Sequence, residues 1–344
     1  MTSVSNLTRA ALSIGSTVNG ATTTYTFTFI AQSPLTDGDR MYIKVPDSIT
    51  APVSPTCAGI SKLASSLTCN TLNKELFITL SFSSGSTLDA GEEFSFSITN
   101  FINPTSTKPT SALTFQAQDS TGSLINDSPS SLSVSVTTDT AASVATASVS
   151  NENKDASQST ALYLNITTVH QIPLNGAIII TYPVEVAPFD SSVTAITCSL
   201  NIASSPTCTH NSATRTITIS NIVTTTPLVA GSQVEITLNE MKNPSTASST
   251  NSFRIITYEV SSGVFYAIDS VTSGLTIASN CNYPCKTCSG TNSSDCLSCL
   301  NDATGTTLLL QTSTTSGVST TTCVSTCDTD YVNINNVCQP CLEN

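Results

Sequence analysis

Residues 88–119 read LDAGEEFSFSITNFINPTSTKPTSALTFQAQD, and residues 228–259 read LVAGSQVEITLNEMKNPSTASSTNSFRIITYE. The two stretches align without a gap, and both carry Leu-x-Ala-Gly at the start and Asn-Pro near the middle. In both, apolar residues alternate with polar ones, which is the pattern of β-strands with one buried face. The chain therefore contains an internal repeat of strands with a period of about 140 residues.

The repeat extends beyond these two stretches. Upstream, Gln-Ser-Pro-Leu at 32–35 matches Gln-Ile-Pro-Leu at 171–174, and a pair of cysteines follows in each copy. Downstream, two apolar residues of the first copy match two of the second, namely Leu132 and Val134 with Leu275 and Ile277. We therefore expect three domains, at 1–139, 140–279 and 280–344, of which the last is rich in cysteine.

Alternation predicts the strands inside each copy. Tyr25, Phe27 and Phe29 alternate with threonines, and similar alternation recurs through both copies. No comparable helical stripe of apolar residues is present. Roughly seven or eight short strands per copy, separated by Asp-Gly, Asn-Pro and other turns, predict an all-β chain. The expected fold is two tandem immunoglobulin-like β-sandwiches followed by a small disulfide-rich module, with a β-barrel as the alternative to each sandwich.

The composition indicates where the protein is located and which classes of partner it lacks. The 344 residues include 11 Lys and Arg against 23 Asp and Glu, so we expect no nucleic acid partner. No apolar run approaches the roughly 20 residues of a membrane span. Thirteen cysteines in a chain with few charges predict an extracellular or cell-surface location. The first residues lack the apolar core of a signal peptide, so we expect a removed signal or a longer precursor.

Each copy carries one pair of cysteines around a short loop. Cys57 and Cys69 form the first pair, and Cys198 and Cys208 form the second. A disulfide across such a loop contributes about 3 kcal/mol in the chain-entropy model. The alternative, a metal or redox site, requires His, acidic or further Cys neighbours, and none recurs in both copies. The spacing therefore favours structural disulfides.

The remaining nine cysteines lie in the tail, with three C-x-x-C pairs that raise the possibility of zinc. Zinc ribbons separate their ligand pairs by a dozen or more residues, whereas only seven residues lie between Cys288 and Cys296, and the tail has no His. The tail resembles the furin-like, growth-factor-receptor type of cysteine-rich repeat, from which it departs in a long Thr/Ser insertion before Cys323. The resemblance implies four bridges: Cys281–Cys288, Cys285–Cys296, Cys299–Cys323 and Cys327–Cys338.

Cys341 is left over by this pairing. An odd cysteine in a secreted protein indicates an intermolecular bond or a truncated module, so Cys341 is predicted either to bond another chain or to open a further repeat.

The Asn-Pro turn in INPTSTKPTSALTF, among Thr-rich strands and before furin-like cysteines, is similar to large extracellular proteins of ciliated protists. That resemblance implies surface or extracellular material.

Motifs of catalysis are not found in the sequence. His170 and His210 have no neighbours that indicate a triad or a metal site, and no phosphate loop, nucleophile elbow or H-E-x-x-H is present. The acidic pairs at 92–93 and 37–39 lie at turns, where Asp and Gly serve the backbone, although 37–39 is a weak candidate for Ca²⁺. We therefore expect no enzyme activity, no cofactor and no metal.

Four sequons predict N-linked glycans on a secreted chain. They begin at Asn6, Asn126, Asn165 and Asn292.

Two functions remain at this point. The first is a non-enzymatic, glycosylated structural protein of a surface coat, appendage or filament, which assembles with itself or with other surface proteins. Its subunits would add strands to one another through segments 4–14 or 131–138. The second is an adhesin or receptor ectodomain that binds a carbohydrate or protein ligand. Its candidate aromatic residues are Tyr182, Tyr258, Phe265 and Tyr266.

Overall fold

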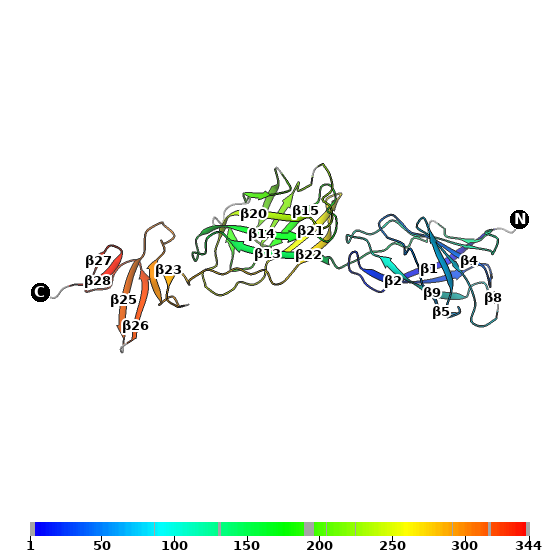
Figure 1. Cartoon of the computed structure of the whole chain (residues 1–344), viewed down its shortest axis with the longest axis horizontal. Coiled ribbons are helices and arrows are strands. Elements are labelled where there is room, and N and C mark those ends of the chain that lie inside the picture. The colour runs from blue at the N-terminus through cyan, green and yellow to red at the C-terminus, as the bar shows by residue number, and fades with distance from the viewer. Residues whose placement is uncertain are drawn as a thin grey trace. The chain divides into compact units, whose positions relative to one another are not determined.

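The computed structural model describes residues 4–85, 87–129, 132–188, 196–203, 205–223, 225–290, 292–315 and 318–341. Every regular element in this part of the chain is a β-strand (Figure 1). None of the described residues belongs to a helix long and apolar enough to cross a membrane. The chain divides into two compact units, Met1–Ala142 with Glu259–Asp269, and Ser143–Tyr258 with Ser270–Asn344. The first unit therefore includes a short segment from the second repeat of the sequence, and the cysteine-rich tail is grouped with the second unit.

The first sandwich consists of eleven strands. They are β1 (Ser5–Ile14), β2 (Thr22–Ala31), β3 (Leu35–Thr36), β4 (Arg40–Lys44), β5 (Cys57–Ser61), β6 (Thr68–Leu72), β7 (Glu75–Thr79), β8 (Thr87–Leu88), β9 (Glu93–Ile102), β10 (Thr114–Gln118) and β11 (Leu124–Asp127). Nine of them follow one path of hydrogen-bonded neighbours, in the order β5-β9-β2-β1-β11-β10-β4-β7-β6. The short strands β3 and β8 pair separately.

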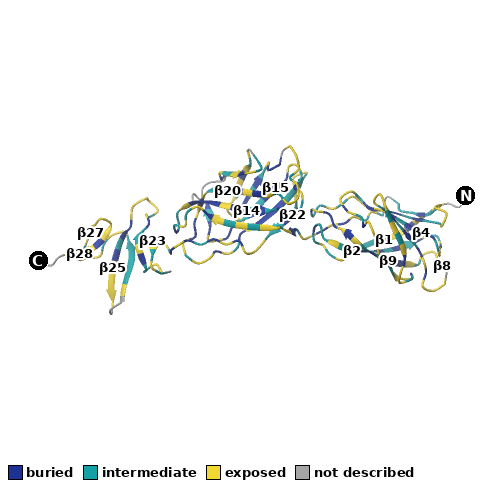
Figure 2. Cartoon of the chain, in the orientation of Figure 1, coloured by how far each residue is buried: buried dark blue, intermediate teal, exposed yellow. Residues whose placement is uncertain are grey.

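Strand β1 connects the two layers of this sandwich. Its residues from Leu7 to Ile14 pair antiparallel with β2, whereas Ser5 and Asn6 pair parallel with β11. One layer is therefore β5-β9-β2-β1 and the other is β11-β10-β4-β7-β6. The alternation predicted at Tyr25, Phe27 and Phe29 is confirmed, because all three side chains are fully buried between the layers. Figure 2 shows buried residues inside each sandwich and exposed residues on the loops.

The second sandwich repeats this topology. Its strands are β12 (Ala142–Ser143), β13 (Thr146–Asn151), β14 (Ser159–Thr167), β15 (Ala177–Thr181), β16 (Ala187–Pro188), β17 (Cys198–Leu200), β18 (Thr207–Asn211), β19 (Thr216–Ser220), β20 (Gln233–Lys242), β21 (Arg254–Ser261) and β22 (Val264–Val271). One layer is β13-β14-β20, with β16 and β17 on β20, and the other is β12-β22-β21-β15-β19-β18. Both sandwiches are thus the same immunoglobulin-like fold.

The downstream match between the repeats is shifted by two positions in the first repeat. The amide of Leu113 donates to the carbonyl of Val134 at 2.7 Å, and the amide of Phe253 donates to Leu275 at 2.8 Å. Because Leu113 and Phe253 are aligned, the counterpart of Leu275 is Val134 and not Leu132. The sequence match failed because it assumed an insertion of three residues in the second repeat, whereas these hydrogen bonds show an insertion of one.

The outer part of hairpin β21–β22 belongs to the first unit. Within that unit, the Glu259 carboxylate accepts hydrogen bonds from Ser106 Oγ and Lys108 Nζ, each at 2.7 Å. Asn19 Nδ2 donates to the carbonyls of Ala267 at 2.8 Å and Ile268 at 2.9 Å.

The cysteine-rich tail consists of short strands and little apolar core. The strands are β23 (Cys285–Cys288), β24 (Cys296–Cys299), β25 (Leu309–Thr315), β26 (Val318–Val324), β27 (Tyr331–Ile334) and β28 (Val337–Pro340). Strands β23 and β24 form a two-stranded sheet, and the others form a sheet in the order β26-β25-β28-β27. The buried cluster here is made of Cys281, Cys285 and Cys296, and the other buried apolar side chains among the described residues are a few leucines and Cys338, so cysteine supplies much of the core.

Candidate functional site

Each sandwich carries a disulfide that joins its two layers at the edge. Cys57 on β5 bonds Cys69 on β6, and these are the two end strands of the nine-stranded path. Cys198 on β17 bonds Cys208 on β18 in the same way. On the opposite side of the first sandwich, β1 passes from one layer to the other. The disulfide therefore joins the two ends of the strand path of the first sandwich covalently.

Removal of the first of these bridges is expected to destabilise the first sandwich. The double substitution Cys57→Ala and Cys69→Ala opens a loop with a sequence separation of 12. The chain-entropy model gives a loss of about 3 kcal/mol in the free energy of unfolding. Urea unfolding followed by hydrogen exchange of β2 and β9 measures this loss. An unchanged midpoint would show that the bridge is dispensable for closure, and Cys341→Ser is the control for loss of a thiol.

The tail contains four disulfides. They are Cys281–Cys288, Cys285–Cys296, Cys299–Cys323 and Cys327–Cys338, the same pairs that the resemblance to furin-like repeats implies. These cysteines are therefore occupied in bridges and not arranged as zinc ligands. Cys341 is a free and exposed thiol, and its backbone amide donates to the carbonyl of Asp330 at 2.7 Å.

The four predicted sequons differ in accessibility. Asn6 and Asn292 are exposed, and Asn165 is half-buried on β14. Asn126 is fully buried, and its Oδ1 accepts the amides of Gln32 and Ser33 at 3.2 and 3.1 Å. The prediction of a glycan at Asn126 is therefore corrected, because its Nδ2 is enclosed in the folded chain.

Glycan occupancy is expected to follow this accessibility. Protein secreted from a eukaryotic host should carry glycans at Asn6 and Asn292, because both side chains are exposed. Asn126 should be unmodified in folded protein. Glycopeptide mass spectrometry measures occupancy at each position, with Asn6→Gln and Asn292→Gln as controls for the assignment. A fully occupied Asn126 in folded protein would contradict the structure.

The carboxylates that were candidates for calcium or catalysis serve local structure. Asp37 Oδ1 accepts the amide of Phe82 at 2.8 Å, and Asp39 Oδ2 accepts the amide of Thr36 at 2.7 Å. Glu92 pairs with Lys62 at 2.8 Å, and this interaction lowers the pKa of the Glu92 carboxyl. The neighbouring Glu93 pairs with Arg9. Within the described ranges, no group of three or more His, Cys, Asp or Glu side chains could hold a metal ion.

The aromatic residues proposed for ligand binding lie in different environments. Tyr182 is 3% exposed, its hydroxyl lies 2.6 Å from His210 Nε2, and burial raises its pKa. Tyr258 and Tyr266 are half-buried, and Phe265 is exposed on hairpin β21–β22. Tyr182 is therefore enclosed in the core, and the accessible members of this set are the three residues of hairpin β21–β22.

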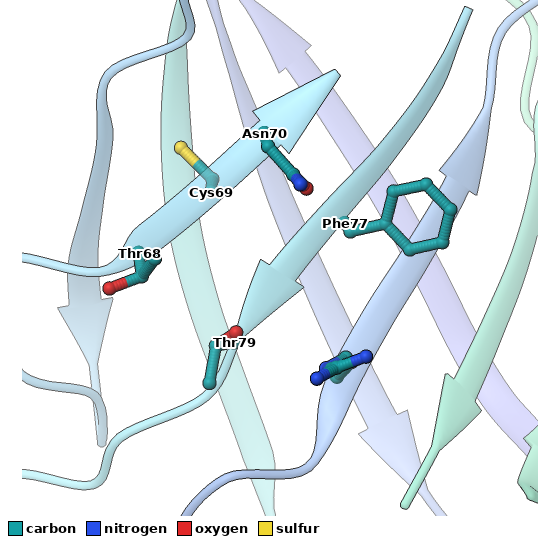
Figure 3. Close-up of a pocket in the computed structure, with 6 residues that line it drawn as sticks. Thr68, Cys69, Asn70, Phe77 and Thr79 are labelled. Carbon is teal, nitrogen blue, oxygen red and sulfur yellow. The ribbon is translucent and has the colours of Figure 1, made fainter. Parts of the chain in front are cut away.

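A different polar and aromatic surface lies on the outer face of the first sandwich, over strands β4, β7 and β6. Figure 3 shows Thr68 and Asn70 on β6 beside Phe77 and Thr79 on β7. Their strands are in register, with Thr68 opposite Thr79 and Asn70 opposite Phe77. Together with Arg40 on β4 and the disulfide-bonded Cys69, they line a hollow of about 340 Å³. The five residues without Cys69 are Arg40, Thr68, Asn70, Phe77 and Thr79. We call these five residues the outer face; all five are exposed or half-buried.

The neighbours of the outer face set its chemistry. Tyr42 on β4 lies opposite Phe77, and the two rings are edge to face with centroids 5.3 Å apart. The pKa of Tyr42 is raised to about 12, mainly by burial and to a smaller extent by the hydrogen bond to Glu75 and its charge. Its hydroxyl therefore stays protonated at neutral pH. The result is a guanidinium, an amide, two hydroxyls and a partly exposed ring on one sheet surface.

Sequence inspection did not identify this surface. Its residues alternate with buried ones, so they appear in the strand pattern only as outward positions. A comparison of outward positions between the repeats would have pointed to this surface, because the two repeats carry different residues there. Arg40 and Tyr42 lie opposite Gln118 and Gln116, and their counterparts in the second sandwich are Ala177 and Ile179.

Comparison with protein-family models gives no match, and comparison with curated proteins also gives none. Similar solved structures include the C-terminal domain of the AgI/II polypeptide BspA of Streptococcus agalactiae, at 8% identity and a TM-score of 0.27, covering 74% of this chain and 95% of that chain. The C-terminal domain of AspA of Streptococcus pyogenes has 8% identity, a TM-score of 0.25 and coverage of 78% and 100%. The serine-rich repeat adhesion glycoprotein Srr1 of Streptococcus agalactiae has 11% identity, a TM-score of 0.22 and coverage of 80% and 100%. Because these TM-scores are below 0.5, the fold is assigned from the strand order of the chain itself.

Proposed function

We propose that this chain is a non-enzymatic extracellular structural protein, a glycosylated subunit of a surface coat, appendage or filament. The observation that carries this proposal is the covalent closure of the sandwiches. Cys57–Cys69 and Cys198–Cys208 each join two sheet layers, and four more bridges hold a tail with little apolar core. Such bonds persist in oxidising compartments outside the cell. The architecture resists unfolding in an environment without chaperones.

Assembly by the two predicted strand donors is not supported. Residues 5–14 form β1, which pairs with β2 from Leu7 to Ile14. In the second segment, Val134 and Val136 accept hydrogen bonds from the amides of Leu113 and Thr110, and Ser131 lies outside the described residues. Both segments therefore complete the first sandwich, and their removal would damage the fold. Contacts between subunits are instead proposed through the exposed thiol of Cys341 and through surface glycans.

Electron microscopy of native, non-reduced material tests this proposal. Regular filaments or sheets are expected, and Cys341→Ser should disperse them while leaving all six internal disulfides in place. Mild reduction of the unmodified protein provides the second comparison. Discrete monomers at every concentration would contradict the structural role. Filaments that survive in the Cys341→Ser variant would place the assembly contact elsewhere on the surface.

A second candidate function, an adhesin that binds a carbohydrate, is favoured by the outer face. Exposed aromatic rings with convergent amide and hydroxyl groups are the usual means of holding a saccharide. Asn70 and Phe77 provide these groups side by side on one sheet. Binding to a glycan array that is lost in the Phe77→Thr variant supports this candidate. Both functions as stated would be excluded if the protein were a discrete monomer that bound no glycan at about 10 mM. That limit corresponds to a binding free energy weaker than roughly 3 kcal/mol.

A further inference from the structure

We propose that the outer face binds an anionic saccharide and that Arg40 pairs with its carboxylate. This inference rests on the second candidate function and adds the charge class of the ligand. Arg40 lines the hollow between Thr68, Asn70, Phe77 and Thr79, and its side chain is exposed to solvent. A guanidinium presents a planar fork of donors that matches a carboxylate in bidentate geometry.

The distribution of charge singles out Arg40. The first sandwich contains six basic residues, and five of them form ion pairs: Arg9, Lys44, Lys62, Lys74 and Lys108. Arg40 takes part in no ion pair among the described residues. Glu75, the carboxylate on the next strand, is already engaged by Lys44 at 3.9 Å and by the Tyr42 hydroxyl. The Arg40 guanidinium is thus available to an anion from outside.

The groups around Arg40 fit the rest of a sugar ring. The half-buried ring of Phe77 is fixed by the edge-to-face contact with Tyr42 at 5.3 Å, so stacking with the C–H face of a sugar costs little side-chain entropy. Asn70 lies opposite Phe77 and offers an amide donor and acceptor. Thr68 and Thr79 face each other and offer hydroxyls. These groups complement the hydroxyls of a saccharide next to its carboxylate.

The second sandwich shows that the fold does not require these residues. Its strands have the same order, but Ala177 and Ile179 take the places of Arg40 and Tyr42. Thr218 and Thr209 lie opposite each other where Phe77 and Asn70 pair in the first sandwich. The fold therefore does not require a cation or an aromatic pair on this face, and we attribute both to the ligand of the first copy.

Three carboxylate-bearing oligosaccharides and their methyl esters test the inference: a galacturonic acid tetramer, a hyaluronan tetramer and a sialylated trisaccharide. The full chain is titrated with each while two-dimensional NMR records the amide shifts of β4, β6 and β7. We expect at least one acid to bind with a Kd of about 0.1–1 mM and its ester, which lacks the charge, to bind about tenfold more weakly. The Arg40→Gln variant should bind the acid only as weakly as the unmodified protein binds the ester.

Lys62→Gln is the matched control, because it removes a cation of the same sandwich that is paired with Glu92 and lies outside strands β4, β6 and β7. It should leave the affinity for the acid unchanged, and equal melting temperatures would show that both variants are folded. Equal affinity for acid and ester, with no effect of Arg40→Gln, would overturn the anionic specificity while leaving carbohydrate binding intact. No shift with any of the six compounds at about 10 mM would overturn the inference, whereas the carbohydrate function itself is tested by the glycan array.

Discussion

Replacement of Cys285 and Cys296 by Ala is expected to unfold the cysteine-rich tail while both sandwiches remain folded. Both sulfur-bearing side chains are fully buried, and with Cys281 they make up the buried cluster of this segment. Loss of one bridge from such a small module typically costs about 2–5 kcal/mol, which is comparable to the whole stability of a module of this size. Limited proteolysis followed by mass spectrometry should then show rapid cleavage between residues 280 and 341.

The control for this experiment is Cys341→Ser, which removes an exposed thiol that is not in a bridge. Its cleavage pattern should equal that of the unmodified chain. A tail that stays resistant to protease after loss of Cys285–Cys296 would mean that the remaining three bridges and the sheet β26-β25-β28-β27 are sufficient to hold it. That result would contradict the role of the cysteine cluster as the core.

Substitution of Phe27 by Ala is expected to lower the free energy of unfolding of the first sandwich by about 3–5 kcal/mol. Phe27 is fully buried, and its ring lies within 6.2 Å of Phe29, Phe96 and Phe115, measured between centroids. These rings come from strands of both layers, so the cavity would lie in the middle of the sandwich. Hydrogen exchange of β2 amides in increasing urea measures the loss.

Ile60→Ala provides the matched control, because Ile60 is 59% exposed on β5 of the same sandwich. A surface substitution of this kind changes stability by roughly 0.5 kcal/mol or less. If Phe27→Ala had an effect as small as that of Ile60→Ala, the aromatic cluster would not be the core of the sandwich. Exchange of amides in β14 of the second sandwich should be equal in all three proteins.

The strand pattern and the repeat were predictable because both depend on local information. Alternation with a period of two identifies Tyr25, Phe27 and Phe29 as inward residues whatever the strand order. The pairing of Cys57 with Cys69 was predictable because a short loop brings the two residues together. Burial of Asn126 was not, since its partners Gln32 and Ser33 are distant in sequence and meet it only after β1, β2 and β11 assemble.

The sequence by itself determined that the chain is all-β, that it contains two copies of one sandwich, and that cysteines take the place of a core in the tail. Only the tertiary structure decided that Cys57–Cys69 joins the two ends of a strand path, since that depends on the order of all nine strands. It likewise brought Arg40, Asn70 and Phe77 onto one surface. Register across strands is a non-local property, and the alternation of each strand alone does not contain it.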